Sequence, residues 1–171
     1  MIRKLILNRL DAEERQLGES LDYLRHMARV SLRAFFKFAK VMPLATYRRV
    51  LPADAYYVAR IVATRDEDCG TCVQIEINLA KSERVSVDVL RAVIADDIDS
   101  LPADLADVCR FARSVVEHTG DDELLRETIR QRYGEQGLVE MSLAIAVCRV
   151  FPTAKRALGF ATSCRLVKLD V

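Results

Sequence analysis

Hydrophobic residues recur every three to four positions along most of the chain, which is the spacing of one face of an α-helix. The first long stripe of this kind consists of Leu17, Leu21, Leu24, Ala28, Leu32, Phe35 and Ala39. It predicts one long amphipathic helix that ends near Pro43, because proline cannot continue a helix. Another face of the same segment carries Arg25, Arg29, Arg33 and Lys37. We interpret this basic stripe as solvated or facing a subunit rather than as a phosphate site.

The middle of the chain predicts three further helices. Residues 55–63 are almost wholly apolar and predict a buried helix. The helical period resumes at Cys72, so the next helix is expected to hold Cys69 and Cys72 in its first turn. Ser86 is expected to cap the following helix, because serine accepts hydrogen bonds from free N–H groups at helix starts.

The last third of the chain predicts helices separated mainly by glycine. One is expected to begin near Ser100, to reach His118 and to end at Gly120. The next one is expected to begin at the acidic residues 121–123. Gly134 and Gly137 are expected to separate it from a helix over residues 138–150. Pro152 is expected to open a last short helix, and residues 166–171 form the only alternating segment, which predicts a short extended tail.

Composition agrees with one helical domain. The chain has 171 residues, of which 51% are hydrophobic and 30% charged, and it contains only 6 glycines and 4 prolines. Such a mix fills a core and gives few turn signals. We therefore expect an all-α fold, a single domain over residues 1–171 built as a bundle of about seven or eight helices.

Charge and hydropathy exclude several partners. The formal net charge is +1, which selects neither nucleic acid nor an anionic membrane surface. Runs without charge reach only about eight residues, short of the roughly 20 that span a bilayer. The N-terminus also meets Arg9 and Asp11 before a signal-peptide core can form. We expect a cytoplasmic protein with no membrane or nucleic-acid partner.

The cysteines supply the candidate chemistry. The chain has five, an odd number that argues against a secreted disulfide scaffold. Cys69 and Cys72 form one CxxC motif, whereas Cys109, Cys148 and Cys164 stand alone. A zinc site would need two more ligands at suitable spacing, so no metal is expected.

A CxxC motif at a helix start places two sulfurs close enough to form and reopen a disulfide. Free N–H groups at the helix start favour a thiolate there. Asp66, Glu67 and Asp68 oppose this effect at Cys69, so Cys72 is expected to be the attacking thiol. Glu76 lies one turn after Cys72 and is either its proton acceptor or a carboxylate paired with an arginine. The alternative is that both cysteines are packed thiols without chemistry.

Two segments resemble one known family. The sequence Glu-Asp-Cys-Gly-Thr-Cys-Val-Gln-Ile-Glu over residues 67–76 resembles the AhpD-like alkylhydroperoxidases of the carboxymuconolactone decarboxylase family. The segment 133–146 looks like the closing core helix of that family, and the resemblance covers roughly residues 15–160. The resemblance implies an all-α, oligomeric fold in which Cys72 attacks a peroxide and Cys69 resolves it. Glu76 stands where the family usually has a histidine, and Tyr57 where it has a glutamate. Glu76 with Tyr57 would therefore form a different proton relay.

The sequence thus predicts a thiol-dependent oxidoreductase, without a bound cofactor, that reduces hydroperoxides or disulfides at the expense of a thiol electron donor. One alternative is a non-catalytic module whose cysteines pack or sense oxidation, which is favoured if Glu76 is held in a salt bridge. Another is a decarboxylase-like enzyme of the same family. A homo-oligomer is expected, since the first helix and residues 138–150 offer more apolar surface than a monomer should expose.

Overall fold

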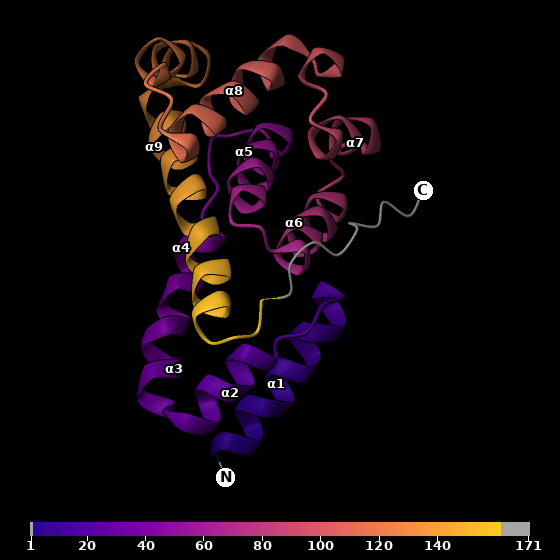
Figure 1. Cartoon of the computed structure of the whole chain (residues 1–171), viewed down its shortest axis with the longest axis vertical. Helices are drawn as coiled ribbons and strands as arrows, with labels where there is room; N and C mark the ends of the chain where they lie inside the picture. The colour runs from indigo at the N-terminus through magenta and orange to yellow at the C-terminus, as the bar shows by residue number, and fades with distance from the viewer. Residues whose placement is uncertain (1, 162–171) are drawn as a thin grey trace.

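The computed structural model describes residues 2–161, and every regular element in that part of the chain is helical (Figure 1). The elements are α1 (Ile2–Leu17), α2 (Asp22–Val30), α3 (Leu32–Phe38), η1 (Ala39–Val41), α4 (Met42–Ala45), α5 (Ala53–Asp66), α6 (Gly70–Ser82), α7 (Val87–Ala95), η2 (Ile98–Ser100), α8 (Ala103–Glu117) and α9 (Asp122–Ala157). The predicted all-α class is confirmed. The predicted tail at residues 166–171 and Cys164 lie outside the described residues.

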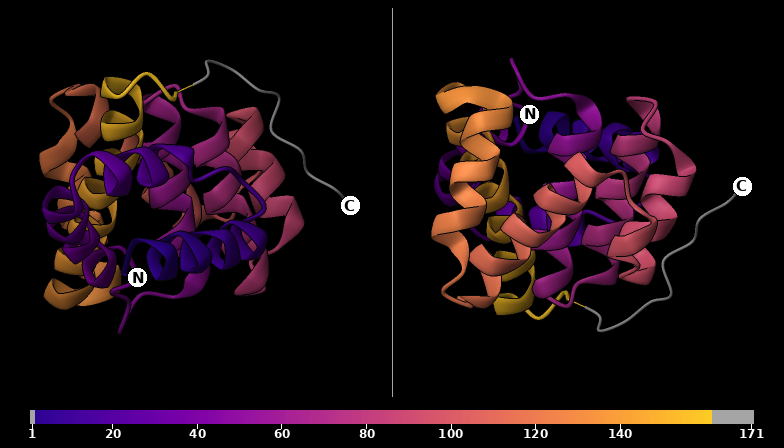
Figure 2. Two further views of the ribbon diagram at one scale, coloured as in Figure 1. Left: turned by 90° about the horizontal axis from the view of Figure 1, so that it is seen from below. Right: turned by 90° about the horizontal axis from the view of Figure 1, so that it is seen from above.

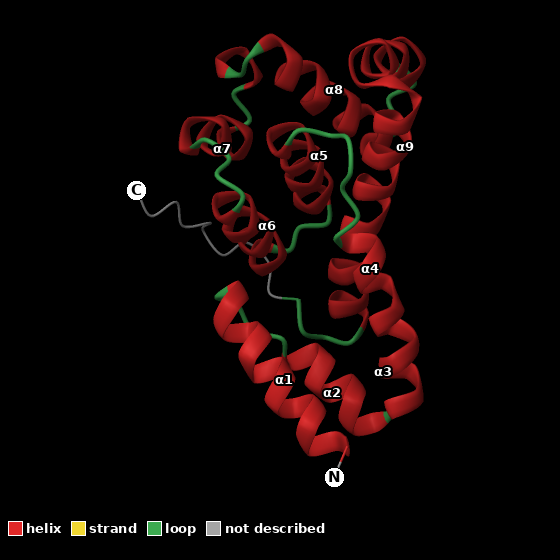
Figure 3. Cartoon of the chain, turned by 180° about the vertical axis from the view of Figure 1, so that it is seen from behind, coloured by secondary structure: helices red, strands yellow, loops and turns green. Residues whose placement is uncertain are grey.

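Helix α5 is the centre of the core. Every residue from Ala55 to Thr64 is buried, as expected for a helix that is apolar nearly all round. Figure 3 shows α5 between α6 and α7 on one side and α9 on the other, with α8 crossing beside it. Ser86 caps α7, and its hydroxyl accepts a hydrogen bond from the N–H of Asp88, as predicted.

The first helices form a separate layer across one end of the bundle (Figure 2). Its small core holds Leu10, Leu21 and Tyr23. The prediction of one long helix up to Pro43 is wrong here. Gly18 takes a left-handed conformation (φ +74°) that ends α1, and Ser31 is extended (φ −146°) and caps α3. The hydrophobic stripe continues across both breaks, so its period did not reveal them.

The basic stripe is mostly solvated. Arg29, Arg33 and Lys37 are exposed, whereas Arg25 is drawn into a network between α1 and α2. There Arg25 donates hydrogen bonds to Asp11 (2.6 Å) and to Glu14 (2.7 Å), and this network holds the two helices together.

Helix α9 runs from Asp122 to Ala157 and is kinked at Gly134 (φ 73°, ψ 175°), where two helical segments meet. The predicted separation at Gly134 is therefore confirmed. Gly137 and Pro152 lie inside the helix, so the predicted break at Gly137 and the predicted start at Pro152 are wrong. At Gly137 the requirement is space, because a Cβ there would lie 2.5 Å from the Cβ of Tyr133.

By length and composition α9 could cross a membrane. However, 50% of its apolar window is buried against the rest of the chain, and core helices of water-soluble proteins also meet this criterion.

A buried carboxylate on α9 fixes the segment that leads into α5. Glu140 is 1% exposed and accepts hydrogen bonds from the backbone N–H groups of Arg49 (2.8 Å), Val50 (3.0 Å) and Leu51 (3.2 Å). These three bonds satisfy donors that have no helical partner. They therefore hold the connection between the N-terminal layer and the core in place.

Candidate functional site

The CxxC motif lies at the turn between α5 and α6. Asp68 adopts a left-handed conformation (φ 48°) that redirects the chain, and Cys69 then occupies the N-cap position of α6. Cys72 lies in the first helical turn, so the predicted placement of the cysteines is confirmed. The two Cα atoms are 5.3 Å apart and the two sulfurs are at disulfide distance. Cys69 is buried (1% exposed), whereas Cys72 is half-buried.

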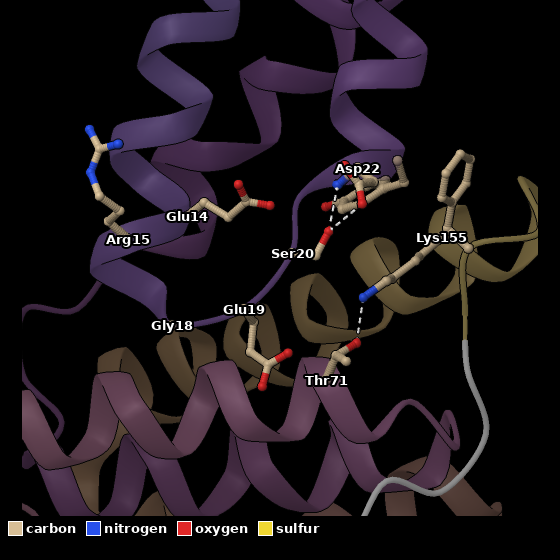
Figure 4. Close-up of a pocket in the computed structure, with 10 residues that line it drawn as sticks. Glu14, Arg15, Gly18, Glu19, Ser20, Asp22, Thr71 and Lys155 are labelled. Carbon is tan, nitrogen blue, oxygen red and sulfur yellow. Dashed lines mark hydrogen bonds between the residues drawn. The ribbon is translucent and has the colours of Figure 1, made fainter.

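A buried lysine, Lys155, is connected to Cys69 through Thr71. The hydroxyl of Thr71 accepts a hydrogen bond from Lys155 Nζ (Figure 4). The same hydroxyl oxygen lies 3.6 Å from Cys69 Sγ. Thr71 is 7% exposed and Lys155 is 5% exposed. A positive charge from the last turns of α9 is therefore linked to the sulfur of Cys69 through one hydroxyl group.

Thr71 and Lys155 also form part of the wall of a cavity of about 670 Å³. The cavity lies between the N-terminal layer and the start of α6 (Figure 4). Its wall is completed by Glu14, Arg15, Gly18, Glu19, Ser20, Asp22, Tyr23 and Phe160. The lining contains more acidic than basic side chains and includes two aromatic rings.

The acidic residues before Cys69 are paired with arginines of α9. Arg149 contacts Asp66 (3.1 Å) and Glu67 (2.6 Å), and Arg156 donates a hydrogen bond to the carbonyl oxygen of Asp68 (2.8 Å). These cations offset the negative charges from which we expected a weaker thiolate at Cys69. The preference for Cys72 as the attacking thiol therefore rests on its greater exposure rather than on those charges.

Glu76 forms a buried ion pair with Arg60 of α5. Arg60 Nε lies 2.7 Å from one carboxylate oxygen and Nη2 lies 2.8 Å from the other. Cys148 Sγ contacts the same carboxylate at 3.7 Å. Both oxygens of Glu76 are engaged, which corresponds to the second of the two roles that the sequence left open for this residue.

Tyr57 belongs to the same buried group. The Arg60 guanidinium lies 5.9 Å from the centre of the Tyr57 ring, and the Tyr56 and Tyr57 rings meet edge to face. Tyr56 receives a hydrogen bond from Arg60 (2.8 Å) and donates one to the carbonyl oxygen of Ala45 (3.0 Å). We call Tyr56, Tyr57, Arg60, Glu76 and Cys148 the Arg60 cluster.

Burial and charge shift the protonation equilibria of the Arg60 cluster. Burial raises the pKa of Tyr57 to about 12, although Arg60 opposes this shift. Burial and then the Glu76 carboxylate raise the pKa of the Cys148 thiol. Burial disfavours the charged guanidinium of Arg60, but the carboxylate of Glu76 still holds the Arg60 pKa well above its ordinary value. Around neutral pH the Tyr57 hydroxyl, the Cys148 thiol and the Arg60 guanidinium therefore keep their protons.

The site predicted from the sequence did not include Arg60, Cys148, Thr71 or Lys155. One signal was available for Arg60, because it is the only charge within the apolar stretch of α5, one turn after Tyr56. A charge at such a position needs a buried partner. Lys155 gave no comparable signal, because its partner lies 84 residues away.

Within residues 2–161 no group of three or more His, Cys, Asp or Glu side chains converges as a metal site would require. The resemblance to the AhpD-like proteins rests on the quoted residues alone. No family model, no curated protein and no solved structure matches this chain.

Proposed function

We propose that this protein is a thiol-dependent oxidoreductase in which Cys69 and Cys72 alternate between a dithiol and a disulfide. The observation that carries the proposal is the placement of the two sulfurs at disulfide distance in the first turn of α6. Cys72 is half-buried and within reach of small reagents, while Cys69 lies behind it. This arrangement suits an attacking thiol with a resolving partner.

The proposed substrates are hydroperoxides or disulfides. With a hydroperoxide, the Cys72 thiolate attacks the distal oxygen, the O–O bond breaks, and an alcohol leaves once it has taken up a proton. Cys69 then attacks the Cys72 sulfenic acid, which forms the disulfide and releases water. Two donor thiols reduce the pair again and become a disulfide themselves. With a disulfide substrate, the dithiol transfers two electrons directly by exchange.

Glu76 and Tyr57 act, in this proposal, as supports rather than as a proton relay. The Glu76 carboxylate neutralises the buried charge of Arg60, which ties α6 to α5 directly behind the cysteine pair. Tyr57 stays neutral around pH 7 because its pKa is raised to about 12. The proton of Cys72 is then transferred to solvent or to the substrate.

The test is a redox titration of the whole protein with thiol and disulfide forms of glutathione, read by mass spectrometry of the Cys69–Cys72 peptide. We expect a two-electron transition confined to this pair. Turnover is then assayed with a hydroperoxide and three donors, namely lipoyl-protein, thioredoxin and glutathione. If the pair forms no reversible disulfide, the proposal fails.

A second candidate function is a redox-sensing module without turnover. The observation that favours it is the buried Arg60–Glu76 ion pair, which removes Glu76 as a free base beside the thiols. A sensor would form the disulfide once per oxidant molecule and would change shape or assembly on oxidation. Stoichiometric oxidation without sustained turnover, with any of the three donors, would decide for the sensor.

We also propose a homo-oligomer in the cytoplasm, where thiol donors are abundant. The homo-oligomer is supported by several large apolar side chains on the surface. Each of these is at least 45% exposed, namely Phe36, Met42, Val50 and Val139. Light scattering at micromolar concentration tests it, and a species of one 19.3 kDa chain would contradict it.

A further inference from the structure

We infer that Lys155, acting through the Thr71 hydroxyl, is a positioning residue that stabilises the thiolate of Cys69 and so controls how readily the pair is reduced. The inference rests on the proposed dithiol function and adds a residue to it. Lys155 has no place in the relay that the sequence predicted.

The hydrogen bond between Lys155 and Thr71 can form in only one direction. The ammonium group of Lys155 can only donate, so the Thr71 oxygen accepts its hydrogen bond. The hydrogen of the Thr71 hydroxyl therefore remains available for donation. Cys69 Sγ lies 3.6 Å from the hydroxyl oxygen and can accept it. A hydroxyl that accepts from a cation is polarised and becomes a stronger donor. The favoured acceptor is a thiolate, because hydrogen bonds to an ionised group are about twice as strong as neutral ones.

The buried surroundings of Cys69 preserve the effect of Lys155 on its thiolate. Cys69, Thr71 and Lys155 are each less than 10% exposed, so water screens their interaction weakly. Two carboxylates of the preceding turn, Asp66 and Glu67, are paired with Arg149.

Within residues 2–161, further charges near this end of α6 come from the turn before it, from α9 and from the N-terminal layer. Asp68 lies in the turn before α6 and has Arg156 of α9 3.8 Å away. From the N-terminal layer, Glu14, Arg15, Glu19 and Asp22 line the cavity. Glu14 is paired with Arg25. Among the described residues, the Thr71 hydroxyl joins the Lys155 side chain to Cys69.

The consequence concerns the reductive step. A donor thiolate attacks the more exposed Cys72 Sγ and forms a mixed disulfide with it. The S–S bond to Cys69 breaks, its electron pair goes to Cys69 Sγ, and the Thr71 hydroxyl donates to the new thiolate. A second donor thiol releases the first as a disulfide. A stabilised leaving thiolate makes the first step faster. In the oxidative direction the same thiolate is the group that attacks the Cys72 sulfenic acid.

The experiment measures the acidity of Cys69 in a Cys72→Ser, Cys164→Ser background, from the ultraviolet absorbance of the thiolate against pH. Burial raises the pKa of the remaining cysteines, Cys109 and Cys148, which keeps them out of the window. Lys155→Met retains the length of the side chain and removes the charge. We expect it to lower the acidity constant of Cys69 about tenfold, the size of one hydrogen bond to a charged group.

Thr71→Val should give the same loss, because it removes the hydroxyl and keeps the shape. The double variant should lose no more than either single one, since both interrupt one chain of contacts. Thr71→Ser and Lys155→Arg should restore most of the effect. Lys37→Met, at an exposed lysine of α3, is the matched control and should change nothing. Circular dichroism verifies that each variant is folded.

With both cysteines present, Lys155→Met should shift the redox equilibrium with glutathione towards the disulfide. A tenfold shift, measured above the thiol pKa, corresponds to about 30 mV. If the pair cycles in the unmodified protein and Lys155→Met leaves both the acidity and the equilibrium unchanged, the inference about Lys155 is wrong and the proposed function stands. If the unmodified pair does not cycle, the proposed function itself fails. An acidity change in Lys155→Met that is absent in Thr71→Val would overturn the hydroxyl route.

Discussion

The cysteine pair lies at the start of α6, and the Arg60 cluster includes Glu76 one turn later on the same helix, yet the two regions hold their reactive groups in opposite ways. In the cysteine pair, Cys72 is half-buried at the edge of the bundle, and Thr71 opens onto a cavity (Figure 4). In the Arg60 cluster, Glu76 is 6% exposed, Arg60 is 3% exposed and Cys148 is 1% exposed. Both regions contain thiols and charged groups, but only in the cysteine pair is a thiol, that of Cys72, accessible to solvent.

The difference shows why residue type is a weak guide to chemistry. Cys148 contacts the carboxylate of Glu76. Judged by residue type alone, this pair would be a thiol activated by a base. Burial and the negative charge of Glu76 both disfavour its thiolate, and the carboxylate is already neutralised by Arg60. Within the described part of the chain no carboxylate contacts Cys72, which lies among the N–H groups of a helix start and is partly exposed to solvent.

The largest expected effect comes from the cysteine pair itself. Cys72→Ser should abolish peroxide reduction, because the attacking sulfur is removed. Cys69→Ser should permit one turnover and leave Cys72 as a sulfenic acid or a mixed disulfide. Mass spectrometry of peroxide-treated single variants reads the result. A sulfenic acid trapped on Cys69 in place of Cys72 would reverse the roles, and none on either would remove the enzymatic proposal.

Thiol labelling compares the two regions directly. In the reduced, folded protein we expect iodoacetamide to modify Cys72 at least about a thousandfold faster than Cys148, because Cys148 becomes accessible only when the core opens. Peptide mapping over time gives both rates, with Cys109 as a second buried reference. Comparable rates for Cys72 and Cys148 would show that the Arg60 cluster is not closed.

Glu76→Gln tests whether the Arg60 cluster is structural. It leaves the buried guanidinium of Arg60 without its counter-charge, which should cost about 3–5 kcal/mol in the free energy of unfolding. Glu83→Gln is the control, since Glu83 pairs with Arg48 at 2.7 Å on the partly exposed end of the same helix. Its loss should stay below about 1 kcal/mol. Denaturant unfolding measures both, and equal losses would contradict the assignment of Glu76 as a buried support.

The smallest effect is a dependence on alkaline pH. The pKa of Tyr57 in the folded protein is about 12, above its ordinary value of about 10. As the pH rises from 10 to 12, the unfolded chain loses this proton and the folded one keeps it, so stability falls by up to about 3 kcal/mol. Tyr57→Phe should flatten this decline in denaturant titrations. The exposed Tyr47→Phe is the control, and an unchanged slope in Tyr57→Phe would show that Tyr57 does not titrate in this range.

Features encoded over a few residues could be predicted from the sequence. The helical period gave the all-α class, and the step from polar to periodic residues after Asp68 placed the cysteines at a helix start. The Ser86 cap was predictable for the same reason. Each of these depends on residues within one or two turns of each other.

Features that depend on distant residues could not be predicted. Arg149 and Arg156 pair with the turn before Cys69 from more than 80 positions away, so a count of the local charges leaves out the cations beside this turn. The pairing of Glu76 with Arg60 requires two helices to pack in one register. At Ser31 the hydrophobic stripe runs on although the helix stops, because the contacts of a separate layer outweigh the local helical preference.

The conformation of the connection into α5 depends on one residue that is distant in sequence, Glu140. Arg49 and Val50 expose their side chains, and Glu140 holds only their backbone N–H groups. Because every residue except proline supplies such a group, these hydrogen bonds place no demand on the side chains at positions 49 and 50, whereas they require an acceptor at position 140. The shape of this loop is therefore expected to tolerate side-chain changes at Arg49 better than the loss of an acid about 90 residues later in the chain.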